Sequence, residues 1–243
     1  MNRNKYVVII PALNEADSIA AVISGIPAQF RGFVIVSDNG STDGTAEIAE
    51  SLGAEVVKCP TRGYGAACLA GISRAQRSSP EVFIFLDGDY SDFPEDMSEI
   101  VAKLENEELD LVIGSRTSGR ADPGSLLPQA VFGNWLATTL LGLRFQARFS
   151  DLGPFRAIRS HALKSLEMSD QNFGWTMEMQ IKAIRKGLRY GEVPVRYRKR
   201  IGKSKITGTV KGTVRAAIKI LWILAKYSGP SAAPRGSSHS NTT

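Results

Sequence analysis

The first half of the sequence alternates short apolar runs with amphipathic stretches, and this alternation limits the possible folds more than any other feature. The apolar runs cover residues 6–10, 33–37, 55–58, 82–86 and 109–113, and helical spacing occupies residues 16–24, 45–52, 65–74 and 94–104. Strands that are apolar on both faces and separated by helices are typical of a mostly parallel sheet covered on both sides. The sequence therefore predicts an α/β fold, in which ligands bind beyond the carboxyl ends of the strands.

The second half predicts further elements and an irregular end. Residues 115–128 are rich in Gly, Pro and Ser and indicate a loop. The elements expected after it are a helix at 129–143, a strand at 155–158, a helix at 175–186, a strand at 189–195 and a helix at 207–227. Residues 228–243 lack apolar periodicity and are predicted to be disordered. We therefore expect a single domain over residues 1–227.

Composition excludes several classes of protein. Of the 243 residues, 43% are hydrophobic and 22% are charged, which is typical of a soluble globular chain. Two cysteines, Cys59 and Cys68, are too few for a disulfide scaffold, and reduced buried thiols favour a cytoplasmic location. No run reaches the ~18 apolar residues of a membrane-spanning helix.

The positive charge is concentrated near the C-terminus. Residues 185–226 contain 13 Lys and Arg and a single acid, Glu192, although the net charge of the whole chain is only +6. Such a region attracts phosphates, whether in a nucleotide, a nucleic acid, an anionic lipid or a phosphorylated substrate. A solvated surface without a ligand is the alternative explanation.

The last predicted helix is basic and amphipathic. Its basic stripe contains Lys211, Arg215, Lys219, Trp222 and Lys226. The opposite, apolar face contains Val210, Val214, Ala217, Ile218, Leu221 and Leu224. A helix of this kind can lie on an anionic membrane surface, or it can pack on the protein through its apolar face. Both interpretations stay open at this point.

Acidic and small residues follow three of the expected strands at the point where each strand ends. Pro11 and Glu15 follow the first strand, Asp38 closes the second, and Asp87 and Asp89 flank a glycine after the fourth. Two carboxylates this close repel each other unless a cation lies between them, and hard oxygen ligands suit Mg²⁺ or Mn²⁺. Asp87 and Asp89 are therefore candidate metal ligands, with Mg²⁺ or Mn²⁺ as the expected cofactor.

The first two loops also have a structural explanation. Asn14 and Glu15 can begin a helix, where a negative charge suits the helix dipole, and Thr42 or Asp43 can cap the helix that follows. Asp38 lies before that turn and is not needed as a cap. It is therefore the functional candidate of the second loop.

Taken in order, the three loops resemble those of the family 2 glycosyltransferases, which have the Rossmann-like GT-A fold. The resemblance runs from Val7 to about Lys205. It implies a nucleotide-sugar half at residues 1–114 and an acceptor half at 115–205. The residues that it places around the nucleotide sugar are Pro11, Glu15, Asp38, Arg62, Asp87 and Asp89, the last of these on the metal of the diphosphate.

Within that family, the second half is most similar to the polyprenyl-phosphate (dolichyl-type) sugar transferases. The similar segments are Ile113-Gly114-Ser115-Arg116, Asp151-Leu152-Gly153-Pro154-Phe155-Arg156 and Arg200-Ile201-Gly202-Lys203-Ser204-Lys205. The resemblance implies that Arg116, Arg200, Ser204 and Lys205 contact phosphates. Guanidinium and ammonium groups suit that role because they stabilise the charge of a departing diphosphate.

The chemistry of the acceptor decides whether a general base is needed. A phosphate acceptor, whose second pKa is about 6, is already ionised at neutral pH, whereas a hydroxyl acceptor needs a base within hydrogen-bond reach. The candidates are Asp151 and Glu178, the latter because burial among Trp and Met side chains would raise its pKa. An exposed position on the polar side of its helix is the alternative for Glu178.

The sequence therefore predicts an inverting, metal-dependent transferase that moves a hexose from a UDP- or GDP-linked sugar to a polyprenyl phosphate. One alternative is the same donor chemistry on a soluble hydroxyl acceptor, such as a phosphorylated small molecule. Another is a sugar-1-phosphate nucleotidyltransferase, but the glycine-rich basic loop that this class needs after its first strand is missing. Nucleic-acid binding is not expected, since the basic region contains no recognition motif. A peripheral position on the cytoplasmic face of a membrane is compatible with a lipid acceptor.

Overall fold

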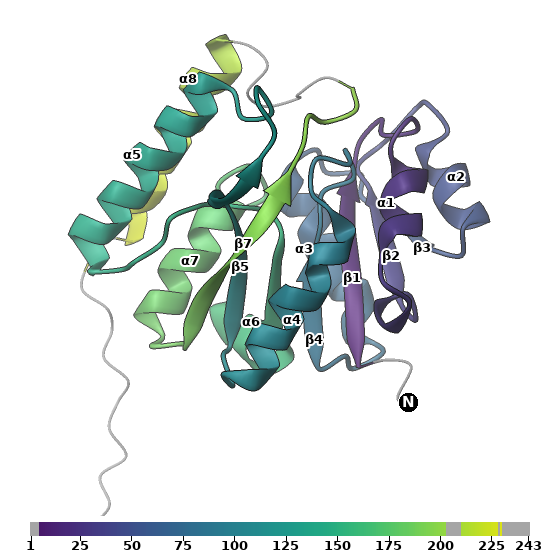
Figure 1. The fold of residues 1–243 in the computed structure, drawn as a ribbon, viewed down its shortest axis with the longest axis horizontal. Helices are drawn as coiled ribbons and strands as arrows, with labels where there is room; N and C mark the ends of the chain where they lie inside the picture. Colours follow the sequence, from purple (N-terminus) through teal and green to yellow (C-terminus); the bar gives the residue numbers. More distant parts are fainter. Residues whose placement is uncertain (1–4, 203–209, 228, 230–243) are drawn as a thin grey trace, which may run out of the picture.

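The computed structural model describes residues 5–202, 210–227 and 229. Within these ranges, seven strands form one sheet in the order β3-β2-β1-β4-β6-β5-β7 (Figure 1). Each strand runs parallel to its neighbours except β6, which is antiparallel to both β4 and β5. The predicted α/β fold with a mostly parallel sheet is therefore confirmed.

The elements follow one another in βα order through the first half. The strands are β1 Tyr6–Ala12, β2 Val34–Asp38, β3 Glu55–Lys58, β4 Val82–Phe85, β5 Leu111–Ala121, β6 Arg156–Arg159 and β7 Tyr190–Tyr197. The α-helices are α1 Ile19–Gly25, α2 Thr45–Ser51, α3 Tyr64–Gln76, α4 Met97–Asn106, α5 Pro128–Phe145, α6 Ser160–Leu166, α7 Trp175–Arg185 and α8 Val210–Tyr227. Two short 3₁₀ turns lie at Ala28–Phe30 and Pro94–Asp96.

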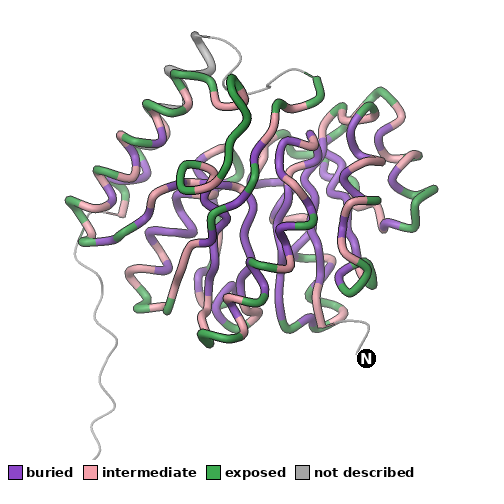
Figure 2. The backbone as a smooth tube through the Cα atoms, in the orientation of Figure 1, coloured by how far each residue is buried: buried purple, intermediate pink, exposed green. Residues whose placement is uncertain are grey.

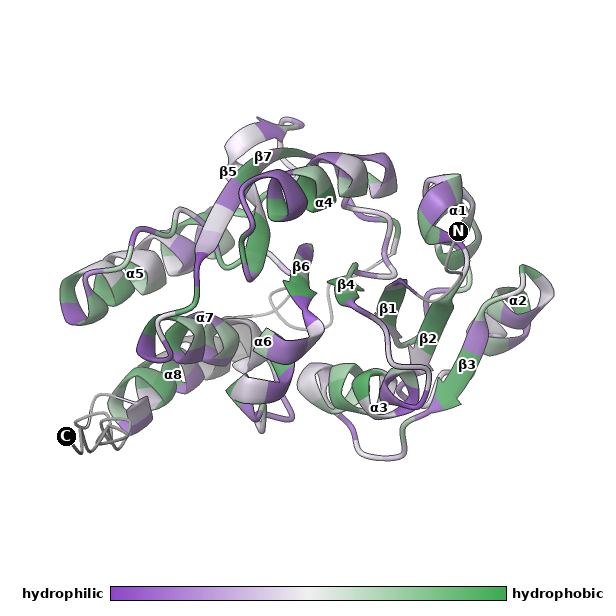
Figure 3. Ribbon diagram, turned by 90° about the horizontal axis from the view of Figure 1, so that it is seen from below, coloured by the Kyte–Doolittle hydropathy of each residue, from purple (hydrophilic) through white to green (hydrophobic). Residues whose placement is uncertain are grey.

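Helices cover both faces of the sheet (Figures 1 and 3). On one face, α1, α2 and α4 pack over alternate strand residues such as Val8 and Ile10. On the other face, α3, α6 and α7 pack over Val7 and Ile9, and α5 and α8 lie outside them at one end of the molecule. Figure 2 shows that the strands run through the buried centre, as expected of strands that are apolar on both faces.

Helix α3 approaches the sheet closely at a glycine. A Cβ atom on Gly71 would lie 2.6 Å from the Ser37 hydroxyl oxygen and 2.7 Å from Cγ2 of Ile9. Only glycine permits this approach. It brings α3, and with it the loop before α3, against the strands that carry the first two acidic loops.

The structure corrects two expectations for the second half. Residues 115–121, predicted as a loop, continue β5 and pair with β7, with an irregularity between Ser115 and Arg120. The Gly and Ser residues that indicated a loop are accommodated because Gly119 lies against the main chain of Val195, where no Cβ atom would fit. Helix α6, at Ser160–Leu166, was not predicted at all.

The structure also corrects the orientation of the last helix. Ile218 and Leu221, which were predicted on the same apolar face as Leu224, are 62% and 52% exposed, while Ile223 and Leu224 are buried. Lys219, expected on the outer basic stripe, forms an ion pair with Asp170 at 2.5 Å. The side chains of Lys211 and Arg215 and the predicted disordered tail at 228–243, apart from residue 229, lie outside the described residues.

Candidate active site

The acidic loops meet at one edge of the sheet because β1, β2 and β4 are parallel. Ala12 at the end of β1 pairs with Asp38 at the end of β2. The main-chain N–H of Asn14 donates to the Ser41 hydroxyl at 2.9 Å, which ties the first loop to the second. The Ser18 hydroxyl donates to the carbonyl of Gly88 at 2.7 Å, which ties the first loop to the third. The fold therefore gathers the loops as the sequence predicts.

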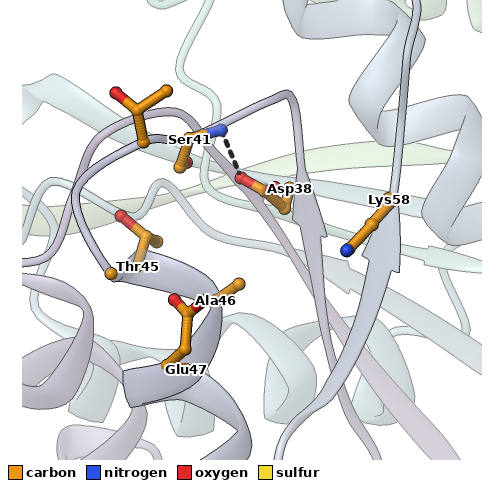
Figure 4. Close-up of a pocket in the computed structure, with 8 residues that line it drawn as sticks. Asp38, Ser41, Thr45, Ala46, Glu47 and Lys58 are labelled. Atoms are coloured by element: carbon orange, nitrogen blue, oxygen red, sulfur yellow. Dashed lines mark hydrogen bonds between the residues drawn. The ribbon is translucent and has the colours of Figure 1, made fainter.

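The predicted nucleotide side is a pocket between the second loop and α2. Asp38 is 6% exposed and accepts a hydrogen bond from the N–H of Ser41 at 2.9 Å (Figure 4). Lys58 projects from β3 into the same hollow, which is lined by Asp38, Ser41, Thr42, Gly44, Thr45, Ala46, Glu47 and Lys58. A pocket with an anionic and a cationic end can hold a polar ligand such as the ribose or base of a nucleotide.

The other predicted nucleotide residues lie around this pocket. Pro11 is buried inside β1, opposite Ser37. Glu15 is half-buried between the second and third loops, with its N–H on the Thr45 hydroxyl at 2.8 Å. Arg62 is exposed, and its guanidinium lies over Gly40, 3.5 Å from where a Cβ atom would be.

A side chain that the sequence interpretation missed holds this arrangement together. The Asn39 amide donates to the carbonyl of Thr61 at 2.7 Å and accepts from the N–H of Gly63 at 2.8 Å. Asn39 therefore fixes the Arg62 loop to the end of β2. Its position directly after Asp38 was the only signal available in the sequence.

Asp87 and Asp89 follow β4 at the centre of the edge. The Tyr64 hydroxyl donates to Oδ1 of Asp87 at 2.9 Å, and the hydroxyl and N–H of Ser91 donate to Oδ1 of Asp89 at 2.5 and 2.9 Å. Burial, followed by the negative charge of Asp89, raises the pKa of Asp87 to about 6. The second of these causes is the repulsion expected between two carboxylates that share a site.

This donor set fits a hard divalent cation. A cation near both carboxylates would relieve the repulsion that raises the pKa of Asp87, and carboxylate oxygens are ligands that Mg²⁺ and Mn²⁺ prefer. Among the described residues, no group of three or more His, Cys, Asp or Glu side chains gathers around one point. Further ligands would therefore come from the substrate or from water, which is how Mg²⁺ is bound in many phosphate sites.

Arg116, a predicted phosphate contact, is held by Asp151. Two nitrogens of the Arg116 guanidinium donate to the Asp151 carboxylate at 2.8 and 2.7 Å, and its main-chain N–H adds a third bond at 2.8 Å. Asp151 is fully buried. Because both of its oxygens are engaged, Asp151 cannot serve as the predicted general base in this arrangement and instead positions Arg116. The guanidinium also lies over the ring of Tyr197, 5.2 Å from its centre.

Arg200, the second predicted phosphate contact, lies against the loop that carries Asp87 and Asp89. Its guanidinium forms an ion pair with Oδ2 of Asp89 at 2.9 Å, and the N–H of Ile201 donates to the carbonyl of Asp89 at 3.0 Å. The site therefore contains two cationic side chains beside two carboxylates. Ser204 and Lys205, the remaining predicted phosphate contacts, lie outside the described residues.

The expected raised pKa of Glu178 is wrong. Glu178 is 1% exposed, but it accepts hydrogen bonds from Ser169, the N–H of Asp170 and the hydroxyl of Tyr227, and it pairs with Lys182 at 2.9 Å. Burial by itself would raise the pKa of Glu178, but these partners, with the hydroxyl of Tyr227 the strongest, outweigh it and lower the pKa to about 2. Glu178 therefore joins α7 to α8 and has the wrong basicity for a general base.

Asp92 is a second side chain that the sequence interpretation missed. It is 1% exposed, and neither of its carboxylate oxygens has a hydrogen-bond partner in the described part of the chain. Burial, followed by the charge of Asp87, raises the pKa of Asp92 well above its usual range, so the neutral acid is favoured. An acid without a hydrogen-bond partner among the described residues, beside the loop of Asp87 and Asp89, is a feature that only the folded structure reveals.

Known proteins are similar in sequence to this chain over most of its length. The model of the Glycosyl transferase family 2 matches residues 7–166. The chain belongs to this family. A glycosyltransferase of Mycobacterium tuberculosis that is named as uncharacterised is 36% identical to it over 214 residues, which cover 87% of this chain and 94% of that protein. The low-salt glycan biosynthesis hexosyltransferase Agl6 of Haloferax volcanii is 31% identical over 206 residues, which cover 82% of this chain and 49% of that protein.

Solved structures support the fold of this glycosyltransferase. Glucosyl-3-phosphoglycerate synthase of M. tuberculosis, in complex with Mn²⁺, UDP and glucosyl-3-phosphoglycerate, superposes with a TM-score of 0.74 at 22% identity. The superposition covers 94% of this chain and 82% of that one. The GT-A fold is thereby confirmed. The family assignment also makes the protein a nucleotide-sugar-dependent glycosyltransferase, and the alternative of a nucleotidyltransferase falls away.

Proposed function

We propose that this glycosyltransferase moves a hexose from a UDP- or GDP-linked sugar to the phosphate of a polyprenyl phosphate, with inversion at the anomeric carbon. The observation that carries the proposal is the position of Arg200, 2.9 Å from Asp89 at the carboxyl edge of the sheet, with Arg116 close enough to influence the pKa of Asp87. One centre thus offers carboxylates for a metal and guanidinium groups for phosphates. Both are needed when a diphosphate leaves and a phosphate attacks.

The donor would lie along the first three loops. Asp38 and Glu15 are assigned to the ribose and base because Asp38 lines the pocket beside α2 and Glu15 lies between the second and third loops. Arg62 and Pro11 border the same region. Because glucosyl-3-phosphoglycerate synthase was crystallised with UDP and with UDP-glucose, a UDP-linked donor is the first to test.

Asp89 and Asp87 would hold the Mg²⁺ or Mn²⁺ ion. The bound ion supplies positive charge to the leaving diphosphate. Arg200, already next to Asp89, can add a second positive charge to the same phosphates. In the chain itself, Tyr64 keeps the Asp87 carboxylate oriented through its hydroxyl.

The state of the two candidate bases supports a phosphate acceptor. Asp151 is engaged by Arg116, and Glu178 has a pKa of about 2, so neither is suited to take a proton from a hydroxyl. A phosphate, whose second pKa is about 6, needs no such base. Its oxygen would attack the anomeric carbon while the bond from that carbon to the diphosphate oxygen breaks. We assign Arg116, whose guanidinium is held by Asp151, to that phosphate.

A soluble phosphorylated acceptor is the second candidate. Glucosyl-3-phosphoglycerate synthase has been crystallised with phosphoglyceric acid, which carries a phosphate that Arg116 and Arg200 could bind equally well. The two candidates share the donor site and differ in the attacking atom, which is a phosphate oxygen of the lipid or a hydroxyl oxygen of the soluble acceptor, and only the hydroxyl needs a general base.

The experiment is a transfer assay with UDP-glucose and GDP-mannose, a short polyprenyl phosphate or 3-phosphoglycerate, and Mn²⁺ or a chelator. We expect metal-dependent formation of a glycosylated polyprenyl phosphate, and a loss of about a hundredfold or more in Asp89→Asn. Glu50→Gln, an exposed acid on α2, is the matched control and should transfer at the normal rate. Transfer to 3-phosphoglycerate alone would replace the lipid acceptor by the soluble one. No turnover of either donor with either acceptor would refute the proposal.

A further inference from the structure

Helices α5 and α8 pack against each other and both turn apolar side chains outward. On α5, Val131, Phe132 and Trp135 are 43%, 60% and 58% exposed. On α8, Ile218, Leu221 and Trp222 are 62%, 52% and 51% exposed. These six side chains, called the α5–α8 surface below, lie on helices that form one end of the molecule (Figures 1 and 3).

This exposure is concentrated rather than scattered. Most of the strongly exposed large apolar side chains of the described residues lie on α5 and α8. Leu52, which is far from both helices in the sequence, is an isolated exposed apolar side chain. On each helix the exposed residues recur at three or four positions, which places them on one face. Contiguous apolar patches on a protein surface mark contacts with other proteins or with membranes.

The charges around the α5–α8 surface select between these partners. Residues 123–150, which include α5, contain no Asp or Glu, and the sequence of α8 contains four Lys and Arg and again no acid. Lys226 is exposed on α8, and its ammonium lies 5.2 Å from the centre of the Trp222 ring. A partner must therefore accept aromatic side chains and be negatively charged. A second copy of the chain would bring two basic surfaces together, which is unfavourable.

We propose that the α5–α8 surface lies on a lipid bilayer that contains anionic lipids. Trp and Phe side chains insert at the boundary between head groups and acyl chains, and basic residues beside them interact with anionic head groups. Among the described helices, none is long and apolar enough to cross a membrane. The proposed contact is between the α5–α8 surface and the bilayer, and it needs neither the sugar donor nor the acceptor substrate to form.

Hydrogen bonds connect helix α5 to the candidate active site. Asn134, on the inner side of α5, donates to the carbonyl of Ser150 at 3.0 Å and accepts from the N–H of Leu152 at 2.9 Å. These two bonds flank Asp151, whose carboxylate holds Arg116. A bilayer under α5 would thus lie beside the arginine that the proposed function assigns to the acceptor phosphate.

The proposal is tested by flotation of the full chain with vesicles of phosphatidylcholine, with and without phosphatidylglycerol. We expect binding to the anionic vesicles and its weakening as salt is raised. Phe132→Ala combined with Trp135→Ala should reduce the partition coefficient about tenfold or more, because two large apolar side chains are removed from the contact. Leu52→Ala, an exposed apolar residue outside the α5–α8 surface, is the matched control and should bind like the original chain.

Tryptophan fluorescence gives a second readout. Trp135 and Trp222 are exposed and Trp175 is fully buried, so acyl chains labelled with bromine should quench the first two and not the third. Trp135→Phe and Trp222→Phe should each leave part of the quenching. The proposal is overturned by absent flotation at low salt, by quenching that neither variant reduces, or by a dimer that the double variant dissociates while vesicles stay unbound. A transfer assay on a soluble acceptor fails or succeeds independently of these results.

Discussion

Glu178→Gln tests whether this carboxylate is a base or part of the framework. In the structure, five donors meet its two oxygens, and two of them, the Tyr227 hydroxyl and the Lys182 ammonium, lie 2.6 and 2.9 Å away. The side chain is 1% exposed, so little water screens these interactions. Glutamine keeps the shape and removes the charge.

The magnitude follows from the pKa of Glu178. A decrease from 4.5 to about 2 corresponds to about 3 kcal/mol of stability at neutral pH. Because the pKa is lower in the folded state, this contribution is complete above the unfolded pKa and is lost as pH falls toward 2. Between pH 7 and pH 3.5, about 1.4 kcal/mol of it should disappear, since protons bind the unfolded chain first.

The assay is urea unfolding followed by tryptophan fluorescence, at pH 7 and at pH 3.5. We expect Glu178→Gln to lose about 3 kcal/mol at pH 7 and about 2 kcal/mol at pH 3.5. The exposed Glu50→Gln should differ little from the original chain at both pH values. The transfer rate of the folded variant should stay within about twofold of normal, because Glu178 does not take part in proton transfer.

Two results would refute this reasoning. A loss of stability that is the same at both pH values would mean that the pKa of Glu178 is not lowered in the folded protein. A variant that is stable but transfers about a hundredfold more slowly would restore Glu178 as the general base.

Three further changes test the interior of the site and its support. Asp92→Asn should stabilise the protein by about 1–3 kcal/mol at pH 7 and not below pH 4. The reason is that the raised pKa of Asp92 lowers stability only at pH values where Asp92 is ionised in the unfolded chain. Equal unfolding curves of the two proteins at pH 7 would contradict this. Tyr64→Phe removes a donor to the Asp87 carboxylate, so the pH at which protons displace Mn²⁺, followed by calorimetry, should rise by about one unit. Gly71→Ala should cost about 1–3 kcal/mol in the same urea assay despite the better helix propensity of alanine, and a stabilised variant would argue against the close approach of α3 to the sheet.

The architecture of the first half could be predicted from the amino-acid sequence alone. Runs such as Val7–Ile10 are apolar at every position because both faces of the strand are covered, and this local pattern needs no knowledge of the strand's partners. The acidic loops could also be placed, since the carboxyl ends of parallel strands meet at one edge. For that reason the amino-acid sequence alone was enough to select Asp38, Asp87 and Asp89 as candidates.

The partners of the charged side chains, in contrast, became known only from the folded chain. Arg116 and Asp151, like Asp89 and Arg200, are far apart in the sequence, and no local pattern records that they meet. The pKa of Glu178 depends on donors from the loop before α7 and from α8, which outweigh the effect of burial and favour the anion. Periodicity reports whether a residue is buried, whereas its charge state depends on what is buried with it.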